Sequence, residues 1–183
     1  MEDHDCNVGE MSGAPSRTPD ALDATPEPIE PAARMNSTIP KLLEATTPDW
    51  QAVVDAALAE FGGSTGTLHR LDPVDQLLKL VAHRGVPEQI MPMIAAIPIG
   101  KGIAGAAAER RAPVELCNLQ ADLGGVAKEG ARKTNVQGSL AVPCLHQGEL
   151  RGTLGVGLMK PHEFSETEKA RLLEIAAAVA ARL

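Results

Sequence analysis

Two helical stripes of apolar residues bracket the central part of this chain. Apolar positions three or four residues apart predict a helix that begins after Pro48, with Thr47 as its N-cap and Gly62 after its end. Its stripe consists of Trp50, Val53, Val54, Ala57, Leu58 and Phe61. A last helix follows the capping-box pair Ser165 and Glu168, with the stripe Leu172, Ile175, Ala176, Val179 and Leu183. Residues 39–45 predict a further short helical turn.

Strand-like alternation lies between these helices. Four segments are predicted strands, paired by tight turns into two hairpins: residues 64–71, 76–83, 139–145 and 150–158. Within the second segment, Leu78, Leu80 and Ala82 alternate with Lys79, Val81 and His83, which predicts one buried face. Residues 113–117 predict another short strand. Because strands joined by tight turns are antiparallel, the pattern predicts an α+β domain with helices on an antiparallel sheet.

A glycine-rich motif at residues 100–105 has the spacing G-x-G-x-x-G, which often marks a dinucleotide cofactor site. Such a loop must follow a buried strand, yet residues 87–99 contain three prolines and no β-branched run. Four alanines in residues 101–111 and the stop at Pro113 do predict a helix after the glycines. We therefore interpret the motif as a turn and helix start within an antiparallel fold, and we expect no cofactor.

Charge divides the chain into two parts. Residues 1–35 contain eight acidic residues and two arginines, a net charge of −6 within a chain total of −7. This segment also has five prolines and few apolar residues, so it cannot bury enough surface to offset its ordering entropy. We expect residues 1–36 to be a disordered, acidic, proline-rich tail and residues 37–183 to form one domain.

Composition also excludes several classes of function. The nearly neutral domain has no concentrated basic face and only three aromatic residues, Trp50, Phe61 and Phe164, so nucleic acid is not an expected partner. The five histidines lack metal-ligand spacing, and no apolar run is long enough to cross a membrane. Three widely spaced cysteines without an export signal predict reduced thiols and a cytoplasmic protein.

Several separate motifs, in the right order, are similar to those of GAF domains. The segment Ile97–Gly105, the short strand after Ala112, the hairpin containing Leu140–Pro143 and Gly148–Val156, and the helix start Phe164–Glu168 all resemble that family. The resemblance runs from about Pro48 to Leu183. It implies a GAF (PAS-like) fold with five or six antiparallel strands. The first and last helices would lie on one face, and a small-molecule pocket on the other.

The resemblance also implies which residues line such a pocket. They come from the glycine segment, the end of the short strand, the long loop at residues 118–136 and the closing hairpin: Ile99, Gly100, Lys101, Gly102, Ile103, Ala104, Cys117, Leu119, Arg132 and Val142. The free amides at the helix start, with Lys101, Lys128, Arg132 and Lys133 nearby, favour a small anion as the ligand. The opposing interpretation is that these cations are merely solvated.

Several activities found in GAF proteins do not match this sequence. It lacks the Asn-Lys-x-x-x-Phe-Asp-Glu signature of cyclic nucleotide binding, a cysteine beside a histidine for bilin, and a well-placed axial histidine for haem. Free methionine-(R)-sulfoxide reductases are compact GAF proteins that need a reactive thiolate. Here Ala104 stands where that family has a cysteine, which leaves Cys117 or Cys144 as the nucleophile.

We therefore expect a regulatory domain that binds a small molecule and is not an enzyme. The alternatives are a thiol-dependent reductase using Cys117 or Cys144, and a degenerate interaction module whose pocket is filled by its own side chains. No effector module follows the last helix in the sequence, so we expect the output to act through a partner protein or through self-association. The alanine-rich last helix favours a homodimer.

Overall fold

The fold comes from a computed structural model, which describes residues 38–118 and 135–183. The chain divides into two units, residues 1–34 and 35–183, and all described residues belong to the second. The predicted disordered tail of residues 1–36 lies outside the described part. The helices of the second unit are α1 (Thr38–Glu44), α2 (Trp50–Phe61), the short 3₁₀ helix η1 (Glu88–Ile90), α3 (Met91–Ile94), α4 (Gly102–Arg110) and α6 (Glu166–Ala180).

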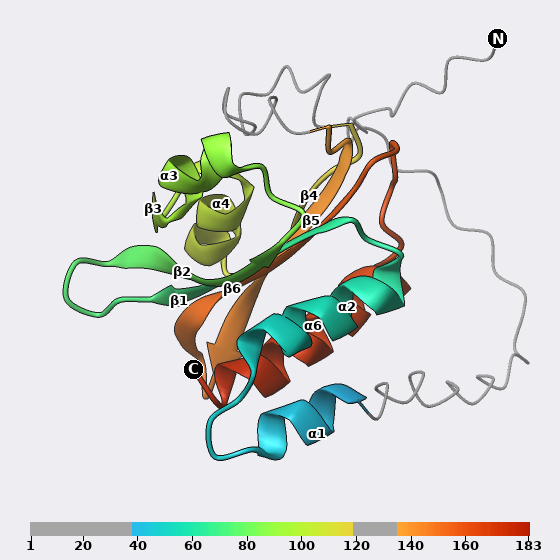
Figure 1. The fold of residues 1–183 in the computed structure, drawn as a ribbon. Helices are drawn as coiled ribbons and strands as arrows, with labels where there is room; N and C mark the ends of the chain where they lie inside the picture. Colours follow the sequence, from blue (N-terminus) through green and yellow to red (C-terminus); the bar gives the residue numbers. More distant parts are fainter. Residues whose placement is uncertain (1–37, 119–134) are drawn as a thin grey trace, which may run out of the picture. The chain divides into compact units, whose positions relative to one another are not determined.

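A six-stranded antiparallel sheet forms the centre of this unit (Figure 1). Its strands are β1 (Thr65–Leu71), β2 (Leu77–Arg84), β3 (Ala96–Pro98), β4 (Val114–Leu116), β5 (Gly138–His146) and β6 (Glu149–Leu158). The spatial order is β3-β2-β1-β6-β5-β4, so β1 and β6 lie in the middle. The α+β fold class is confirmed, and the six strands agree with the five or six that the family resemblance implied.

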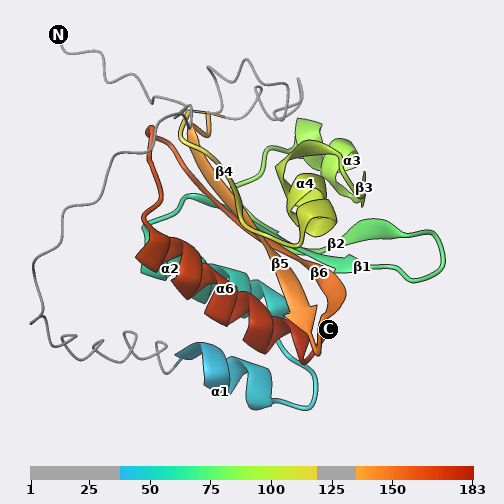
Figure 2. The ribbon, with the colours of Figure 1, turned by 180° about the vertical axis from the view of Figure 1, so that it is seen from behind.

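One face of the sheet is covered by α2 and α6, with α1 packed against both helices (Figures 1 and 2). The main hydrophobic core lies between these helices and the sheet. It includes Leu68 and Leu154 from the central strands and Leu172, Ile175 and Val179 from α6, all fully buried. The predicted stripes of both long helices therefore face the core, as the spacing of their apolar residues indicated.

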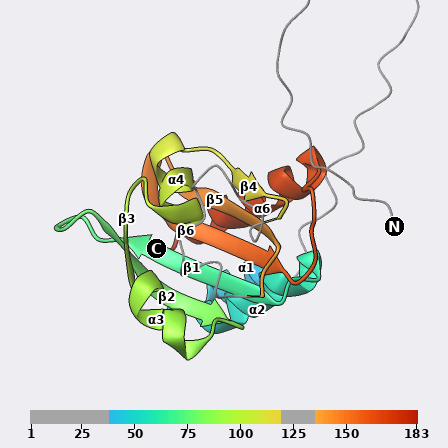
Figure 3. The ribbon, with the colours of Figure 1, turned by 90° about the horizontal axis from the view of Figure 1, so that it is seen from above.

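The opposite face of the sheet carries α3 and α4 (Figures 1 and 3). The helix α3 lies beside β3 at one edge, whereas α4 packs on β5, β6 and β4 toward the other edge. A small apolar cluster of Ala106, Ala107, Val114 and Ala141, with Ile103 beside it, attaches α4 to the sheet. The central strands β1 and β6 run between these two helices when the face is seen from above (Figure 3).

Local sequence signals account for most element ends. Ser165 and Glu168 form the predicted capping box at the start of α6, and Gly62 ends α2 in the left-handed conformation with φ of 59°. The turn between β5 and β6 is Gln147-Gly148, both with positive φ, as a two-residue hairpin requires. The N-cap of α2 is Asp49, whose carboxylate accepts from the Ala52 amide at 3.1 Å. The prediction of Thr47 as the cap was wrong, because Asp49 is the residue whose side chain reaches the first-turn amides.

Two strand predictions need correction. A β-bulge between β1 and β2 pairs Leu68 with Ala82 but His69 with Leu80, so Val81 is an extra residue in β2. Ala82 consequently belongs to the core on the helix side, and Leu80 lies opposite His69, so the predicted common face of Leu78, Leu80 and Ala82 is broken. No strand was predicted before the glycine motif, because residues 87–99 contain three prolines, yet residues 96–98 form the edge strand β3, where proline is tolerated.

Candidate functional site

Polar side chains line the middle of the sheet on the side covered by α3 and α4. Side chains alternate along a strand, and Leu68 and Leu154 point into the core under α2 and α6. Their neighbours His69 and Thr153 therefore point to the opposite side, where they are direct cross-strand partners of β1 and β6. Thr65 lies on the same side, since it precedes His69 by four residues along β1.

Four buried polar atoms on this side have no hydrogen-bond partner among the described residues. They are Thr65 Oγ1, His69 Nδ1, His83 Nδ1 and Thr153 Oγ1, and we call these four residues the polar face. His83 belongs to it because the bulge places it opposite Thr67 on β1. His69 and Thr153 are only 1% exposed. Buried polar groups nearly always have a hydrogen-bond partner, so four unpaired groups on one side of the sheet indicate a candidate binding site.

The ring of His69 has a defined tautomer. Its Nε2 lies 2.9 Å from the carbonyl oxygen of Ile94 at the end of α3. Burial lowers the pKa of His69 to about 4, although the Ile94 carbonyl acts in the opposite direction, so the ring is neutral at pH 7. A carbonyl oxygen only accepts, so Nε2 carries the proton and Nδ1 presents a lone pair. The polar face thus offers one fixed acceptor beside hydroxyl groups that can rotate.

Two glycines of β6 leave the surface beside the polar face free of side chains. Gly155 pairs with Thr67, and a Cβ built on it would lie 3.2 Å from Thr67 Oγ1. Gly157 pairs with Thr65, and its Cβ would lie 2.9 Å from the Val136 side chain. Side chains at these positions would crowd Thr65 and Thr67. The two glycines therefore leave room for the side chains of Thr67 and Val136.

The structure brings the predicted glycine-segment residues together at the start of α4. Ile99 and Gly100 form the turn after β3, and the Gly100 amide donates to the Gly105 carbonyl at 2.8 Å. Lys101 is the exposed N-cap of α4, whose N-terminus has no side-chain cap. Gly102 has φ of 63°, a backbone conformation that favours glycine. Ala104 lies in the first turn of the helix, and Ile103 packs against Val136, as Leu116 does.

The remaining predicted residues do not join this group. Val142 is fully buried in the core under α2 and α6, so the sheet separates it from α4. Cys117 follows β4 and is half-buried. Leu119 and Arg132 lie outside the described residues, together with Lys128 and Lys133. Of the ten predicted residues, the structure therefore assembles the six from Ile99 to Ala104.

The cysteines differ from the expected set of reduced thiols. Cys117 is disulfide-bonded. Cys144 is free and fully buried in the core on the α2 and α6 side. Burial raises the pKa of the Cys144 thiol far above its usual range. A thiol in this environment is a packing residue, since nucleophilic cysteines need an accessible, stabilised thiolate.

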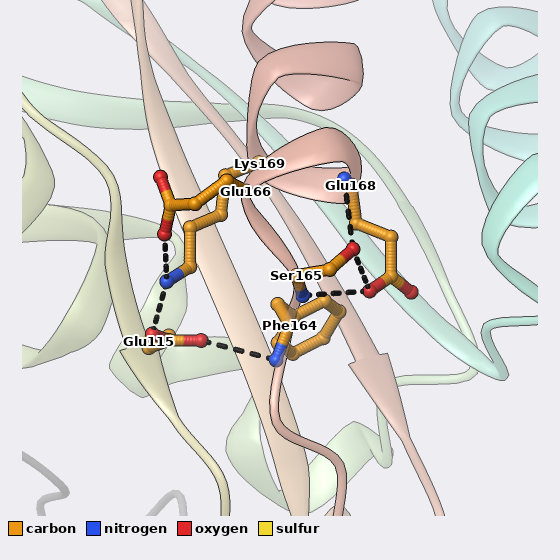
Figure 4. A network of polar contacts seen from close by, with 6 residues as sticks. All are labelled: Glu115, Phe164, Ser165, Glu166, Glu168 and Lys169. Carbon is orange, nitrogen blue, oxygen red and sulfur yellow. Dashed lines mark hydrogen bonds and ion pairs between the residues drawn. The ribbon is translucent and has the colours of Figure 1, made fainter. Parts of the chain in front are cut away.

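A network of charged groups links β4 to the start of α6 (Figure 4). The Lys169 ammonium lies 2.5 Å from Glu115 and 3.0 Å from Glu166, and Glu115 also accepts from the Phe164 amide at 3.2 Å. The hydrogen bond to Glu115 contributes most to a raised pKa of Lys169. Because Val114 packs against α4 from the same short strand, β4 connects the helices of the two faces.

A groove of about 500 Å³ lies elsewhere, between the β1–β2 hairpin and the start of β6. Two of its cations already form ion pairs, Lys79 with Asp75 at 2.6 Å and Arg151 with Glu149 at 2.8 Å. We therefore regard the polar face as the better candidate site. In the described ranges, no cluster of three or more potential ligands could hold a metal ion. None of the described helices is long and apolar enough to span a membrane.

Sequence reasoning missed the residues of the polar face. From the sequence, the histidines were assessed as metal and haem ligands, and none was predicted to line a binding site. The available signal was the polar sequence Thr65, Thr67, His69 at a spacing of two, on the side of a predicted strand away from Leu68. In a strand with neighbours on both sides, such a row is buried and needs partners.

The architecture is that of an α+β domain, with helices on both faces of one antiparallel sheet. The sequence profile described as "GAF domain" matches residues 50–183, which is most of the chain. The chain therefore belongs to the GAF domain family, as the sequence motifs indicated. A search of curated protein sequences found no match.

Solved structures share the fold at low sequence identity. The GAF domain of a phosphoenolpyruvate-protein phosphotransferase from Acinetobacter matches with a TM-score of 0.66 and 18% identity, covering 78% of this chain and 86% of that chain. The corresponding domain from Coxiella burnetii gives 0.65 and 22%, covering 79% and 92%. The free methionine-R-sulfoxide reductase of Neisseria meningitidis, solved with its substrate, gives 0.63 and 20%, covering 79% and 83%. Since these neighbours include GAF domains of phosphotransferases and a reductase, the likeness establishes the fold alone.

Proposed function

We propose that this chain is a regulatory domain that binds a small molecule on the polar face, beneath α3 and α4. One observation carries the proposal: four buried polar atoms on that face lack a partner among the described residues. Each unmet buried group costs about 1–3 kcal/mol. A ligand that pairs with several of them recovers much of this cost, so the folded domain is already arranged for binding.

A small anion was the ligand predicted from the sequence. In its favour, α4 starts without a side-chain cap, and free first-turn amides attract negative charge. Against it, Lys101 is exposed, and the buried ring of His69 is neutral at pH 7 because burial lowers its pKa to about 4. The geometry therefore favours a small polar ligand with hydrogen-bonding groups over an anion held by cations.

The two alternative functions have less support. A thiol-dependent reductase needs a reactive thiolate, and Cys144 is buried on the wrong side of the sheet for the polar face. A degenerate module would fill its site with its own side chains, whereas the polar face keeps unpaired groups and the glycines Gly155 and Gly157 beside them.

We further propose that binding acts on a partner or a second copy of the chain through α6. The ion pair of Lys169 with Glu115 supports such coupling, because it attaches α6 to a strand that also packs against α4. In the alanine-rich stretch predicted to form a dimer contact, Ala176 and Ala180 belong to the core, whereas Ala177 and Ala181 are exposed. A homodimer stays a prediction, to be tested by sedimentation at tens of micromolar protein.

Native mass spectrometry of freshly purified protein tests the binding proposal by looking for a retained small molecule. We expect the Thr153→Val variant, which removes one hydroxyl from the polar face, to weaken retention about tenfold. Thr167→Val is the matched control, because Thr167 is exposed on α6. If no molecule is retained and no polar compound in a thermal-shift screen stabilises the protein, the proposal is wrong.

A further inference from the structure

The unpaired nitrogen of His69 limits which chemical group can occupy the polar face. The Ile94 carbonyl fixes the proton on Nε2, at a distance of 2.9 Å, so Nδ1 is an acceptor only. This nitrogen is buried and has no partner among the described residues. An acceptor of this kind is satisfied only by a group that brings its own N–H or O–H.

Thr153 is placed to contact the same ligand group. It is the direct cross-strand partner of His69, and side chains paired in this way have Cβ atoms about 5 Å apart. Both side chains are 1% exposed, and both present an unpaired polar atom on one side of the sheet. A hydroxyl both donates and accepts, so Thr153 can pair with several kinds of ligand group. His69 Nδ1 only accepts, so it is the residue that discriminates between ligands.

We propose that the ligand of the polar face is a small neutral or ammonium-bearing molecule that donates a hydrogen bond to His69 Nδ1, with Thr153 Oγ1 as its second contact. This inference rests on the proposed function. It excludes a carboxylate or nitrate group at this position, because an unprotonated anion oxygen facing the Nδ1 lone pair leaves both acceptors without a proton. Sites built around one hydrogen bond of this kind reject analogues that lack the complementary group.

Acetamide and acetate form a matched pair of probes, because they have nearly the same shape and only acetamide carries N–H donors at pH 7. Each is titrated into ¹⁵N-histidine-labelled protein while the Nδ1 resonance of His69 is followed by NMR. Ethylammonium chloride is the cationic donor, and sodium chloride controls for ionic strength. We expect a saturable shift of Nδ1 with acetamide and ethylammonium, and at least a tenfold weaker response to acetate.

Two variants separate recognition from folding. His69→Gln keeps an amide N–H that can donate to Ile94 but removes the acceptor at the Nδ1 position, so the preference for acetamide over acetate should disappear. Because this variant has no imidazole to observe, its binding is followed through backbone amide signals of β1 and β6. If it fails to fold, Thr153→Val with the Nδ1 readout intact is used, and acetamide binding should weaken about tenfold.

The outcomes distinguish this inference from the proposed function. Binding of acetate with an equal or larger response at Nδ1 overturns the donor requirement but leaves a ligand site on the polar face. An ordered water that donates to Nδ1 and stays in place at saturating acetamide also overturns it. If no probe moves Nδ1 while native mass spectrometry finds a retained molecule that Thr153→Val releases, the inference fails and the proposed function stands. If neither method detects binding, both fail.

Discussion

The ammonium of Lys169 in α6 lies 2.5 Å from the carboxylate of Glu115 in β4, two residues separated by more than fifty positions in sequence. Glu115 makes a second contact, accepting from the Phe164 amide just before the capping box of α6. These two contacts fix the start of α6 to the edge strand β4, which is distant from α6 in the sequence.

Removing the Glu115 carboxylate should loosen that connection. Glu115→Ala leaves the Phe164 amide without its partner and leaves Lys169 paired only with the exposed Glu166, so we expect a loss of about 1–2 kcal/mol in the free energy of unfolding. Urea denaturation measures it. Glu166→Gln is the control: Glu166 also binds Lys169 but is 91% exposed, so its loss should be much smaller. Equal effects of the two variants would show that Glu115 is only a surface partner.

The buried ring of His69 predicts a specific dependence of stability on pH. Its pKa is about 4 in the folded protein and 6.5 in the unfolded chain, so the unfolded state binds the proton more readily. The contribution of the neutral ring is complete above pH 6.5 and is lost as the pH falls toward 4, by about 3 kcal/mol in all. We expect the His69→Gln variant to lack this pH-dependent loss in the free energy of unfolding when unfolding is measured from pH 7 to 4. Parallel curves for the two proteins would contradict the assignment.

The glycine motif should be most sensitive at Gly105. A Cβ at this position would lie 2.5 Å from the Pro98 carbonyl oxygen, so Gly105→Ala must shift α4 away from β3, at a cost of about 2–3 kcal/mol. Gly102→Ala meets nothing within 4 Å and costs only about 1 kcal/mol, from its left-handed backbone. Thermal unfolding ranks the stabilities of the two variants. The reverse order would mean that the left-handed backbone at Gly102 matters more for stability than the packing of Gly105 against β3.

Cys144 should be inert in the folded protein. Its thiol is fully buried and its pKa is raised by that burial, so almost no thiolate is available at pH 8. We expect iodoacetamide to label Cys144 only when urea unfolds the domain, as followed by peptide mass mapping. Rapid labelling under native conditions would revive the thiol-dependent enzyme as an alternative.

Local patterns were enough to predict most of this fold. The stripes of the two long helices, the capping box at Ser165 and the Gln147-Gly148 hairpin are all decided by residues close together in sequence. The bulge at Val81 could not be predicted, because it depends on the register of β2 against β1 and not on β2 itself. The edge strand β3 was missed for a similar reason, since its prolines are acceptable only at the border of a sheet.

The candidate site was harder to predict than the fold. The family resemblance indicated the start of α4, and the structure does bring Ile99 to Ala104 together there. It also indicated Val142, which faces the core, because adjacent residues of β5 point to opposite sides and Ala141 is the one toward α4. His69 and Thr153 become a pair only through the register of β1 with β6, which joins positions far apart in the chain.

That register has a consequence for how a signal would cross the domain. Leu68 and His69 are neighbours in β1, as Thr153 and Leu154 are in β6, and in each pair one side chain belongs to the polar face and the other to the core under α2 and α6. Only the backbone of β1 and β6 therefore separates the polar face from the core under α2 and α6. A small rotation of either strand, if it accommodated a ligand on one side, would reposition apolar contacts of α2 and α6 on the other. Communication between the two compartments needs no hinge and no long relay.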